Sequence, residues 1–320
     1  MTKRVTNLFK NDGKNFWQVT GPVDFNMTND YMFKATLQEC PLALKGLISA
    51  LLRVDPESIE AEITNPIELG KSIINKDFYL DAKVIINNKR CINLEMQIEN
   101  LGNWPERALS YTARAYDSLQ KGDLYTDVMP MHHIGFVCFN IFENHNILYD
   151  TFSLKNNDGT LIFSDKFMLS VVNLKQIDKA SDEDVQYNLD KWCRFITAQS
   201  WEELQILAKE DSYMEATANT LYMFNSDFDA RENAIRRKEY YDAIAYRDRK
   251  MDEMDVIIAK QDVAIAEKDA TIADKDATIA EQDAAIADKD ATIADMDATI
   301  ADMDATIAKL KKQLAKYENS

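Results

Sequence analysis

Isoleucine recurs every seven residues through the last fifth of this 320-residue chain. The series runs from Ile258 to Ile307, and Leu314 continues it. An apolar spacing of seven is the period of helices that pack as a coiled coil. As a single helix, residues 251–317 would be roughly 100 Å long, since each residue adds about 1.5 Å. The repeat therefore predicts a long helical spacer and oligomeriser rather than a catalytic unit.

The heptad register follows from charge. If isoleucine took position d, every position a from Asp262 to Asp304 would be an aspartate, and buried like charges would be costly. We therefore place isoleucine at position a. Position d is then polar until the stretch from Ile293 to Leu314, where stability should be concentrated. β-Branched residues at position a favour two strands, so we expect a parallel homodimer through residues 251–320. A lone, marginally stable helix is the alternative.

Charge and composition narrow the class of protein. The net charge of −17 argues against broad nonspecific attraction to nucleic acid. Residues 231–250 have the opposite balance of charge, with seven basic and four acidic side chains. This segment is either a patch for phosphates or a solvated helix face. There is no apolar leader, no run long enough to span a bilayer and no CxxC pair. We expect a soluble cytoplasmic protein with reduced thiols and no membrane partner.

The rest of the chain has a mixed α and β pattern. A helix is expected from an N-cap at Thr28 to about Val54, with Pro41 as an interruption or boundary. A second helix should begin at Pro105 and reach about Lys121. Further helices are expected over residues 184–224 and from 229 into the heptads. Strands are expected over residues 60–64, 78–86, 91–98, 134–142, 147–154 and 167–174.

Two of these strands form a hairpin whose register can be derived. Residues 79–86 and 91–98 each alternate apolar and polar side chains around a short polar turn. Directly paired residues share a face, so the apolar faces coincide only if paired residue numbers sum to an even value. A turn centred on Asn88 gives a sum of 176. Burial of the apolar face then sets Asp81 opposite Glu95 on the other face.

Two opposed carboxylates repel each other unless a cation or a proton lies between them. A hard divalent ion, Mg²⁺ or Mn²⁺, suits oxygen ligands from Asp81, Glu95 and the backbone carbonyl of Met96. Such an ion activates water and stabilises charge on a phosphate. Gln97 projects beside Glu95 and could orient the attacking water, while Lys83 and Arg107 could neutralise a phosphate. The alternative is a solvated polar strand face, which is the more common outcome for such a pattern.

Adjacent histidines, His132 and His133, precede the strand expected at residues 134–142. Neighbouring side chains point to opposite faces of a strand, so the two cannot easily bind one ion. We expect a strand-edge role for them. The chain has no GxxxxGK[ST], GxGxxG or GxSxG motif, which removes the main support for an NTPase, a Rossmann enzyme or a serine hydrolase.

The hairpin and its surroundings resemble a known superfamily. The segments NDYMFK (29–34), LDAKV (80–84), NLEMQ (93–97), ERALSYTARAYDSLQKGDLY (106–125) and HIGFVCFNIF (133–142) look like PD-(D/E)XK nucleases, and in particular like the Rpn family of recombination-promoting nucleases or putative transposases. The resemblance covers roughly residues 25–230. It implies an α/β restriction-endonuclease-like core with a central mixed sheet, and a link to recombination, mobile elements or defence.

The resemblance also suggests residue roles. Asp81 matches the metal-binding aspartate and Glu95 the second metal-binding acid, whereas Gln97 stands where the superfamily has lysine. A neutral amide can hold a water but cannot stabilise a developing negative charge as an ammonium does. Asp30, in the first helix of the motif, could add another acid near the metal, although an early helical acid also suits the helix dipole. Arg107 and Tyr111 lie one helical turn apart and could face the site, with core packing as the alternative for Tyr111.

The sequence therefore predicts a metal-dependent DNA endonuclease that hydrolyses phosphodiester bonds. We divide the chain into an N-terminal extension (1–24), a nuclease-like domain (25–230), a basic helical connector (231–250) and a heptad-repeat coiled-coil tail (251–320). One alternative is a nuclease-fold module that no longer cuts and instead binds DNA or self-associates. A purely structural scaffold is a third reading, but it leaves the N-terminal domain unexplained.

Overall fold

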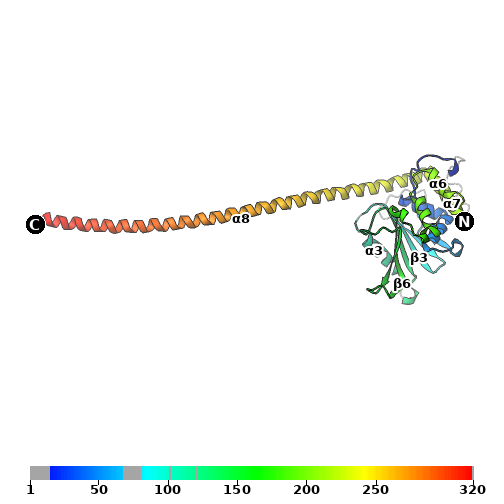
Figure 1. Ribbon diagram of the computed structural model, residues 1–320, viewed down its shortest axis with the longest axis horizontal. Helices are drawn as coiled ribbons and strands as arrows, with labels where there is room; N and C mark the ends of the chain where they lie inside the picture. Colours follow the sequence, from blue (N-terminus) through cyan, green and yellow to red (C-terminus); the bar gives the residue numbers. More distant parts are fainter. Residues whose placement is uncertain (1–14, 68–80, 101, 118, 120–121, 319–320) are drawn as a thin grey trace. The chain divides into compact units, whose positions relative to one another are not determined.

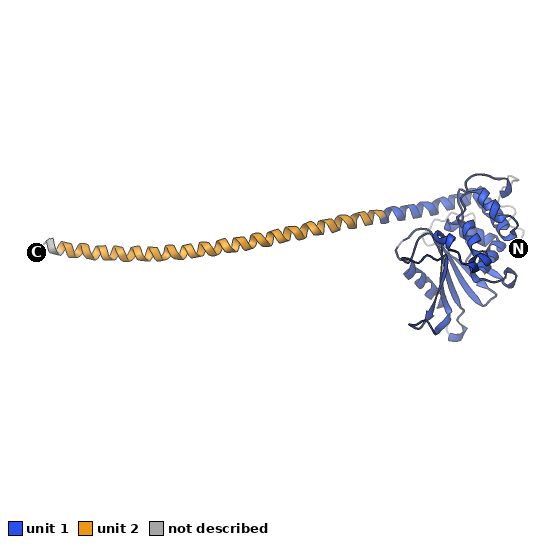
Figure 2. Ribbon diagram, in the orientation of Figure 1, with its two compact units in different colours: residues 1–248 blue, residues 249–320 orange. Residues whose placement is uncertain are grey.

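The computed structural model describes residues 15–67, 81–100, 102–117, 119 and 122–318. The chain separates into two compact units, which we call unit 1 (residues 1–248) and unit 2 (residues 249–320) (Figure 2). Unit 1 holds a six-stranded mixed sheet with helices on both faces, and a long helix continues from it into unit 2. The predicted α/β class and the long C-terminal helix are confirmed.

Two helices precede the sheet, α1 (Asp30–Glu39) and α2 (Pro41–Leu52). The side chain of Asn29 caps α1 by accepting a hydrogen bond from the Met32 backbone N–H at 3.2 Å. The cap is therefore Asn29, whereas the sequence pattern predicted Thr28. Pro41 is the helix boundary, because the first position of α2 needs no backbone N–H.

The predicted hairpin is formed by β2 (Ala82–Ile86) and β3 (Arg90–Gln97), with β1 (Ala61–Ile63) on the outer side of β2. Asn87 and Asn88 form its turn, with φ angles of 49° and 53°. Asparagine tolerates this left-handed conformation better than most residues, and tight hairpins require it.

The register of the hairpin is the predicted one. Ala82 pairs with Leu94 and Ile86 with Arg90, so paired numbers sum to 176. One step beyond the last pair, Asp81 stands opposite Glu95. Residues 78–80 of the predicted first strand lie outside the described residues.

The remaining strands are β4 (Met131–Val137), β5 (Tyr149–Lys155) and β6 (Ile162–Asn173), and the sheet order is β1-β2-β3-β4-β6-β5. Strands β3, β4 and β6 run parallel, and the outer pairs are antiparallel. Strand β4 begins and ends earlier than the predicted 134–142. Its pairing stops at Val137 because β6, its neighbour, ends opposite at Asn173.

One face of the sheet packs on the main core. Its inward residues are apolar and alternate along the strands, as Val84, Leu94 and Phe136 illustrate. Helices α1 and α2 belong to this core, as do α5 (Leu189–Thr197) and α7 (Ser212–Ser226). The other described helices of the region predicted as helical are α4 (Asp182–Gln186) and α6 (Trp201–Ala208); 3₁₀ turns lie at Phe16–Gln18, Pro56–Ser58, Tyr125–Asp127 and Leu174–Lys179.

The opposite face of the sheet is covered by α3 (Trp104–Tyr116), which contacts β4 and β6 (Figure 1). A small apolar cluster joins Trp104 and Ala108 to Val137. The helix was predicted to reach Lys121, but it ends at Tyr116, where the backbone N–H of Asp117 bonds to the carbonyl of Ala113. This face also carries the polar residues of β3, so α3 is one wall of the candidate site.

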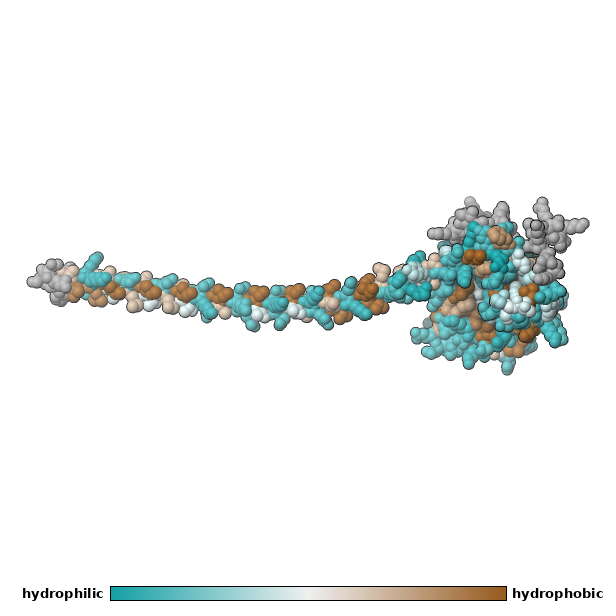
Figure 3. All heavy atoms as spheres, turned by 90° about the horizontal axis from the view of Figure 1, so that it is seen from above, coloured by the Kyte–Doolittle hydropathy of each residue, from teal (hydrophilic) through white to brown (hydrophobic). Residues whose placement is uncertain are grey.

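Helix α8 (Phe228–Glu318) is continuous from unit 1 through unit 2, as expected from the heptads. Its apolar residues recur along unit 2 (Figure 3). The isoleucines from Ile258 to Ile307 are each 45–56% exposed, so the stripe has no cover within the described chain. None of the described helices is both long enough and apolar enough to cross a lipid bilayer.

The strand-edge role expected for the two histidines is wrong, because β4 is a central strand between β3 and β6. His132 is 3% exposed, and its Nε2 lies 2.7 Å from the Ser170 hydroxyl. Burial, reinforced by the positive charge of Arg90 and by His133, lowers the pKa of His132 to about 3. The histidine is therefore neutral in the folded protein.

This buried histidine should make stability depend on pH. The pKa of a histidine in the unfolded chain is about 6.5. Below that pH the unfolded state therefore binds a proton at His132 that the folded state does not bind. Its contribution to stability is present above pH 6.5 and falls by about 1.4 kcal/mol per pH unit below it. We expect His132→Gln to reduce this dependence by about 2 kcal/mol between pH 7.5 and pH 5. Urea unfolding followed by tryptophan fluorescence measures it; equal pH dependence in both proteins would contradict the assignment.

Gly135 of β4 is required by the packing of α3. A Cβ at this position would lie 2.2 Å from Cζ2 of Trp104, well inside contact distance. We expect Gly135→Ala to destabilise the fold by about 1–3 kcal/mol by forcing the indole aside. The double variant Gly135→Ala/Trp104→Phe should recover part of that loss in the same denaturant titration. Additive losses from the two substitutions would show that the clash is not the cause.

Candidate active site

Glu95 lies in the C-terminal half of β3, and its side chain contacts Arg107 of α3. Its Oε1 accepts a hydrogen bond from Nη2 of Arg107 at 2.6 Å. Its Oε2 lies 3.3 Å from Nε2 of His133. Burial raises the pKa of Glu95, but the contact with His133 and the charge of Arg107 outweigh it, so the pKa lies below its usual value. Glu95 is therefore held as an anion.

Asp81 directly precedes β2 and follows the hairpin register. Burial raises its pKa, the charge of Glu95 raises it further, and the ammonium of Lys34 and a hydrogen bond from Asn93 oppose the rise. The hairpin register sets Asp81 opposite Glu95, and Asn93 lies on the same face two residues before Glu95. Oδ1 of Asp81 is buried and has no hydrogen-bond partner among the described residues.

Lys34 contacts Asp81 from α1, and sequence reasoning assigned it no role. Its Nζ donates a hydrogen bond to the Asp81 backbone carbonyl at 2.8 Å, and the residue is 1% exposed. Burial lowers the pKa of Lys34 to about 8, with the negative charge of Asp81 opposing the shift. The available signal was a lysine within an apolar helical stretch, DYMFKATL, because such a residue needs a buried anion.

Gln97 is 2% exposed, and both ends of its amide are bonded to protein. Its Oε1 accepts from Nη2 of Arg107, and its Nε2 donates to the Glu99 carbonyl at 2.7 Å. The guanidinium of Arg107 thus bridges Glu95 and Gln97. Arg107 therefore places beside Gln97 the positive charge that a glutamine lacks. Lys34 adds a second cation at Asp81.

The acid pair is suited to a divalent ion. Oδ1 of Asp81 and Oε2 of Glu95 are both buried carboxylate oxygens without a hydrogen-bond partner among the described residues. Leaving such groups unsatisfied is costly, and an oxygen-seeking cation would satisfy them. Within the described ranges, no group of three or more His, Cys, Asp and Glu side chains is placed to hold a metal. The protein would therefore offer two carboxylates, and the Met96 carbonyl, water or a phosphate would complete the coordination.

His133 also belongs to this cluster, although the sequence did not assign it there. It is completely buried, pairs with Asn93 across β3 and β4, and places Nδ1 3.2 Å from Asn93 Nδ2. The register between parallel strands β3 and β4 decides which of the two histidines faces Glu95. That register depends on contacts between distant segments, so no local pattern reveals it.

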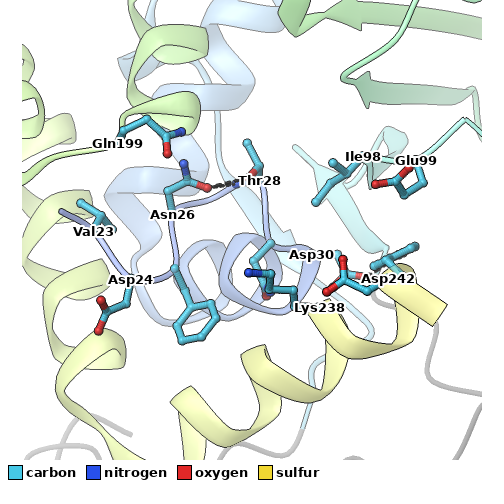
Figure 4. A pocket seen from close by; sticks show the side chains of 13 residues that line it. Val23, Asp24, Asn26, Thr28, Asp30, Ile98, Glu99, Gln199, Lys238 and Asp242 are labelled. Carbon is cyan, nitrogen blue, oxygen red and sulfur yellow. Dashed lines mark hydrogen bonds between the residues drawn. The ribbon is translucent and has the colours of Figure 1, made fainter. Parts of the chain in front are cut away.

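Asp30 is engaged elsewhere. Its carboxylate accepts hydrogen bonds from Nε of Arg237 at 3.1 and 3.0 Å and from the hydroxyl of Tyr241 at 2.9 Å, both on α8. It occupies the first turn of α1, where an acid also suits the helix dipole. A cavity of about 300 Å³ opens beside it, bounded also by Ile98 and Glu99, which directly follow Gln97 (Figure 4). Asp30 thus lies near the end of β3 and is bound to an arginine.

The two remaining candidates are less central. Lys83 pairs with Asn93 across the hairpin, so it shares the polar face, and its charge opposes the rise that burial causes in the pKa of Cys91. Tyr111 lies one turn beyond Arg107 on α3 and is half-buried. The roles assigned to both stay predictions.

The basic segment at residues 231–250 is largely neutralised by the protein itself. Five of its seven basic side chains form ion pairs with carboxylates: Arg231 with Asp24, Arg236 with Glu232, Arg237 with Asp30, Arg247 with Asp248 and Lys250 with Glu253. These pairs favour a structural helix face over a patch that binds phosphates.

Comparison with known proteins gives one result. A family model described as "PD-(D/E)XK nuclease family transposase" matches residues 27–250, from two residues before the cap of α1 to two residues beyond the end of unit 1. No curated protein and no solved structure matches the chain. The matched range spans well over half of the chain and includes the hairpin, α3 and the residues around Asp81 and Glu95. The chain therefore belongs to the PD-(D/E)XK nuclease family transposases.

Proposed function

We propose that this protein is a metal-dependent DNA endonuclease that hydrolyses phosphodiester bonds with Mg²⁺ or Mn²⁺. The observation that carries the proposal is the pair of buried carboxylate oxygens of Asp81 and Glu95, which the hairpin register sets opposite each other and which accept no hydrogen bond from the described residues. Two such acids at a solvated structural face would be satisfied by water. The family match supports nuclease chemistry, and its description as a transposase supports DNA as the substrate.

The side chains around the acids have distinct tasks in this reaction. A bound divalent ion would activate water and stabilise negative charge on the phosphate. Lys34 fixes the Asp81 backbone, and therefore the direction of its carboxylate. Arg107 is 24% exposed and charged, so its guanidinium can reach a phosphate oxygen. The oxygen of water bonds to phosphorus and gives up one proton to solvent, the ester P–O bond breaks, and the departing oxygen takes a proton from solvent.

We also propose that residues 251–320 form a parallel homodimer with a second copy of the chain. The stripe of isoleucines is about half exposed along eight heptads, which is a large apolar surface for an isolated helix. Position d becomes apolar only at Met296, Met303 and Leu310, and these side chains are 57–59% exposed. The dimer should therefore be held mainly by the C-terminal heptads.

The nuclease proposal is tested by nicking of supercoiled plasmid in Mg²⁺ or Mn²⁺. We expect Asp81→Asn to reduce cleavage by about 100-fold or more, because metal stabilisation of the transition state is worth several kcal/mol. The same substitution at Asp158, in the exposed turn between β5 and β6, is the matched control and should cut normally. Wild-type protein that binds DNA without either metal and never cuts it would instead identify a nuclease-fold binding module.

The dimer proposal is tested by sedimentation equilibrium at micromolar concentration. The full chain should sediment at twice its 36.6 kDa mass, and a chain ending at residue 250 should be monomeric. The pair Ile300→Asp/Ile307→Asp should dissociate the dimer, because it buries charge in the apolar end of the seam. The pair Ile265→Asp/Ile272→Asp, among polar d positions, should weaken it less. A monomeric full chain, or equal effects of the two pairs, would contradict the model.

A further inference from the structure

One amide group links the two candidate metal ligands. The side chain of Asn93 lowers the pKa of Asp81, as a hydrogen-bond donor does, and a carboxylate can only accept, so the amide nitrogen is the group that acts on Asp81. The same Nδ2 lies 3.2 Å from Nδ1 of His133. An amide nitrogen carries two hydrogens, so Asn93 can serve Asp81 with one and His133 with the other.

This contact fixes the form of the His133 ring. If Nδ1 accepts from Asn93, it carries no hydrogen, and in a neutral imidazole the hydrogen then resides on Nε2. Nε2 is the atom that lies 3.3 Å from Oε2 of Glu95. The separation suits an electrostatic contact, although its direction is not that of a hydrogen bond, and neither atom has another partner among the described residues.

We propose that His133 is a positioning residue for the metal site, and that with Asn93 it forms a relay, Asp81–Asn93–His133–Glu95, which holds the two acids in a fixed relation. The proposal rests on the proposed function, because it assumes that the acid pair binds a cation. In this arrangement His133 presents N–H to Glu95 and does not itself coordinate the ion.

Burial distinguishes His133 from the other group that holds Glu95. The side chain of His133 is 0% exposed and stands on β4, a central strand, whereas that of Arg107 is 24% exposed and reaches across from α3. A cation at Glu95 would compete with the guanidinium, which has solvent to move into. The imidazole has none, so it keeps Glu95 aligned when Arg107 leaves.

The first test compares two amides at position 133. His133→Gln places its amide near the position of Nε2 and keeps a donor for Glu95, while His133→Asn reaches only the position of Nδ1. Titration calorimetry with Mn²⁺ should show an affinity about 10- to 100-fold lower for His133→Asn, as for other groups that orient metal ligands, and a smaller loss for His133→Gln. His132→Asn, the neighbouring histidine on the opposite face, should bind Mn²⁺ like the wild type. Equal losses in the Gln and Asn variants, or none in Asn, would overturn the proposal.

The second test needs no substitution in the measured protein. The chain has three histidines, so ¹⁵N-histidine labelling gives three ring patterns, and comparison with His133→Gln and His132→Gln assigns them. In metal-free protein His133 should show the pattern of the Nε2–H form. The Nδ1–H form would overturn the relay, and a shift of Nε2 to metal coordination on adding Zn²⁺ would make His133 a ligand instead.

The two tests separate this proposal from the one on which it rests. If the wild type binds no Mn²⁺, the proposed metal function fails, while the metal-free ring pattern still decides whether the relay exists. If Mn²⁺ binds and the ring carries its hydrogen on Nδ1, the metal function stands and the relay is wrong.

Discussion

Two carboxylates are forced together in this protein by the burial of apolar side chains on the other face of the same hairpin. Strand side chains alternate, so a register that buries Val84 and Leu94 must set Asp81 and Glu95 on the opposite side. That side is only slightly solvated at Glu95, whose side chain is 12% exposed, and α3 packs beside it on β4 and β6. The repulsion between the acids is therefore felt at low dielectric, where only nearby cations can offset it.

The groups that face these acids come from separate parts of the chain, which ties the site to the whole fold of unit 1. Lys34 comes from α1 on the main-core side, Arg107 from α3 on the other, and His133 from the neighbouring parallel strand. The position of α3 depends in turn on Gly135, which leaves room for Trp104. Packing changes far from the acids can therefore disturb the site without touching it.

The sequence predicted those features that local periodicity controls. Alternation in residues 79–98 was sufficient for the hairpin register, and the seven-residue spacing was sufficient for a continuous C-terminal helix. The predicted end of β4 was wrong because a strand ends where its neighbouring strand ends. An apolar run in the sequence carries no information about the length of the neighbouring strand. The places of Lys34 and His133 were missed for a related reason, since each depends on contacts between segments far apart in the chain. The bonds of Asp30 to α8 were equally invisible, because they join residues more than 200 positions apart.

The central claim is that Asp81 and Glu95 share a cation, and anomalous diffraction from a crystal soaked in Mn²⁺ tests it most directly. The account predicts one strong peak in contact with Oδ1 of Asp81 and an oxygen of Glu95, with the guanidinium of Arg107 displaced. A well-ordered site with no peak, or a peak only at other carboxylates, would contradict it.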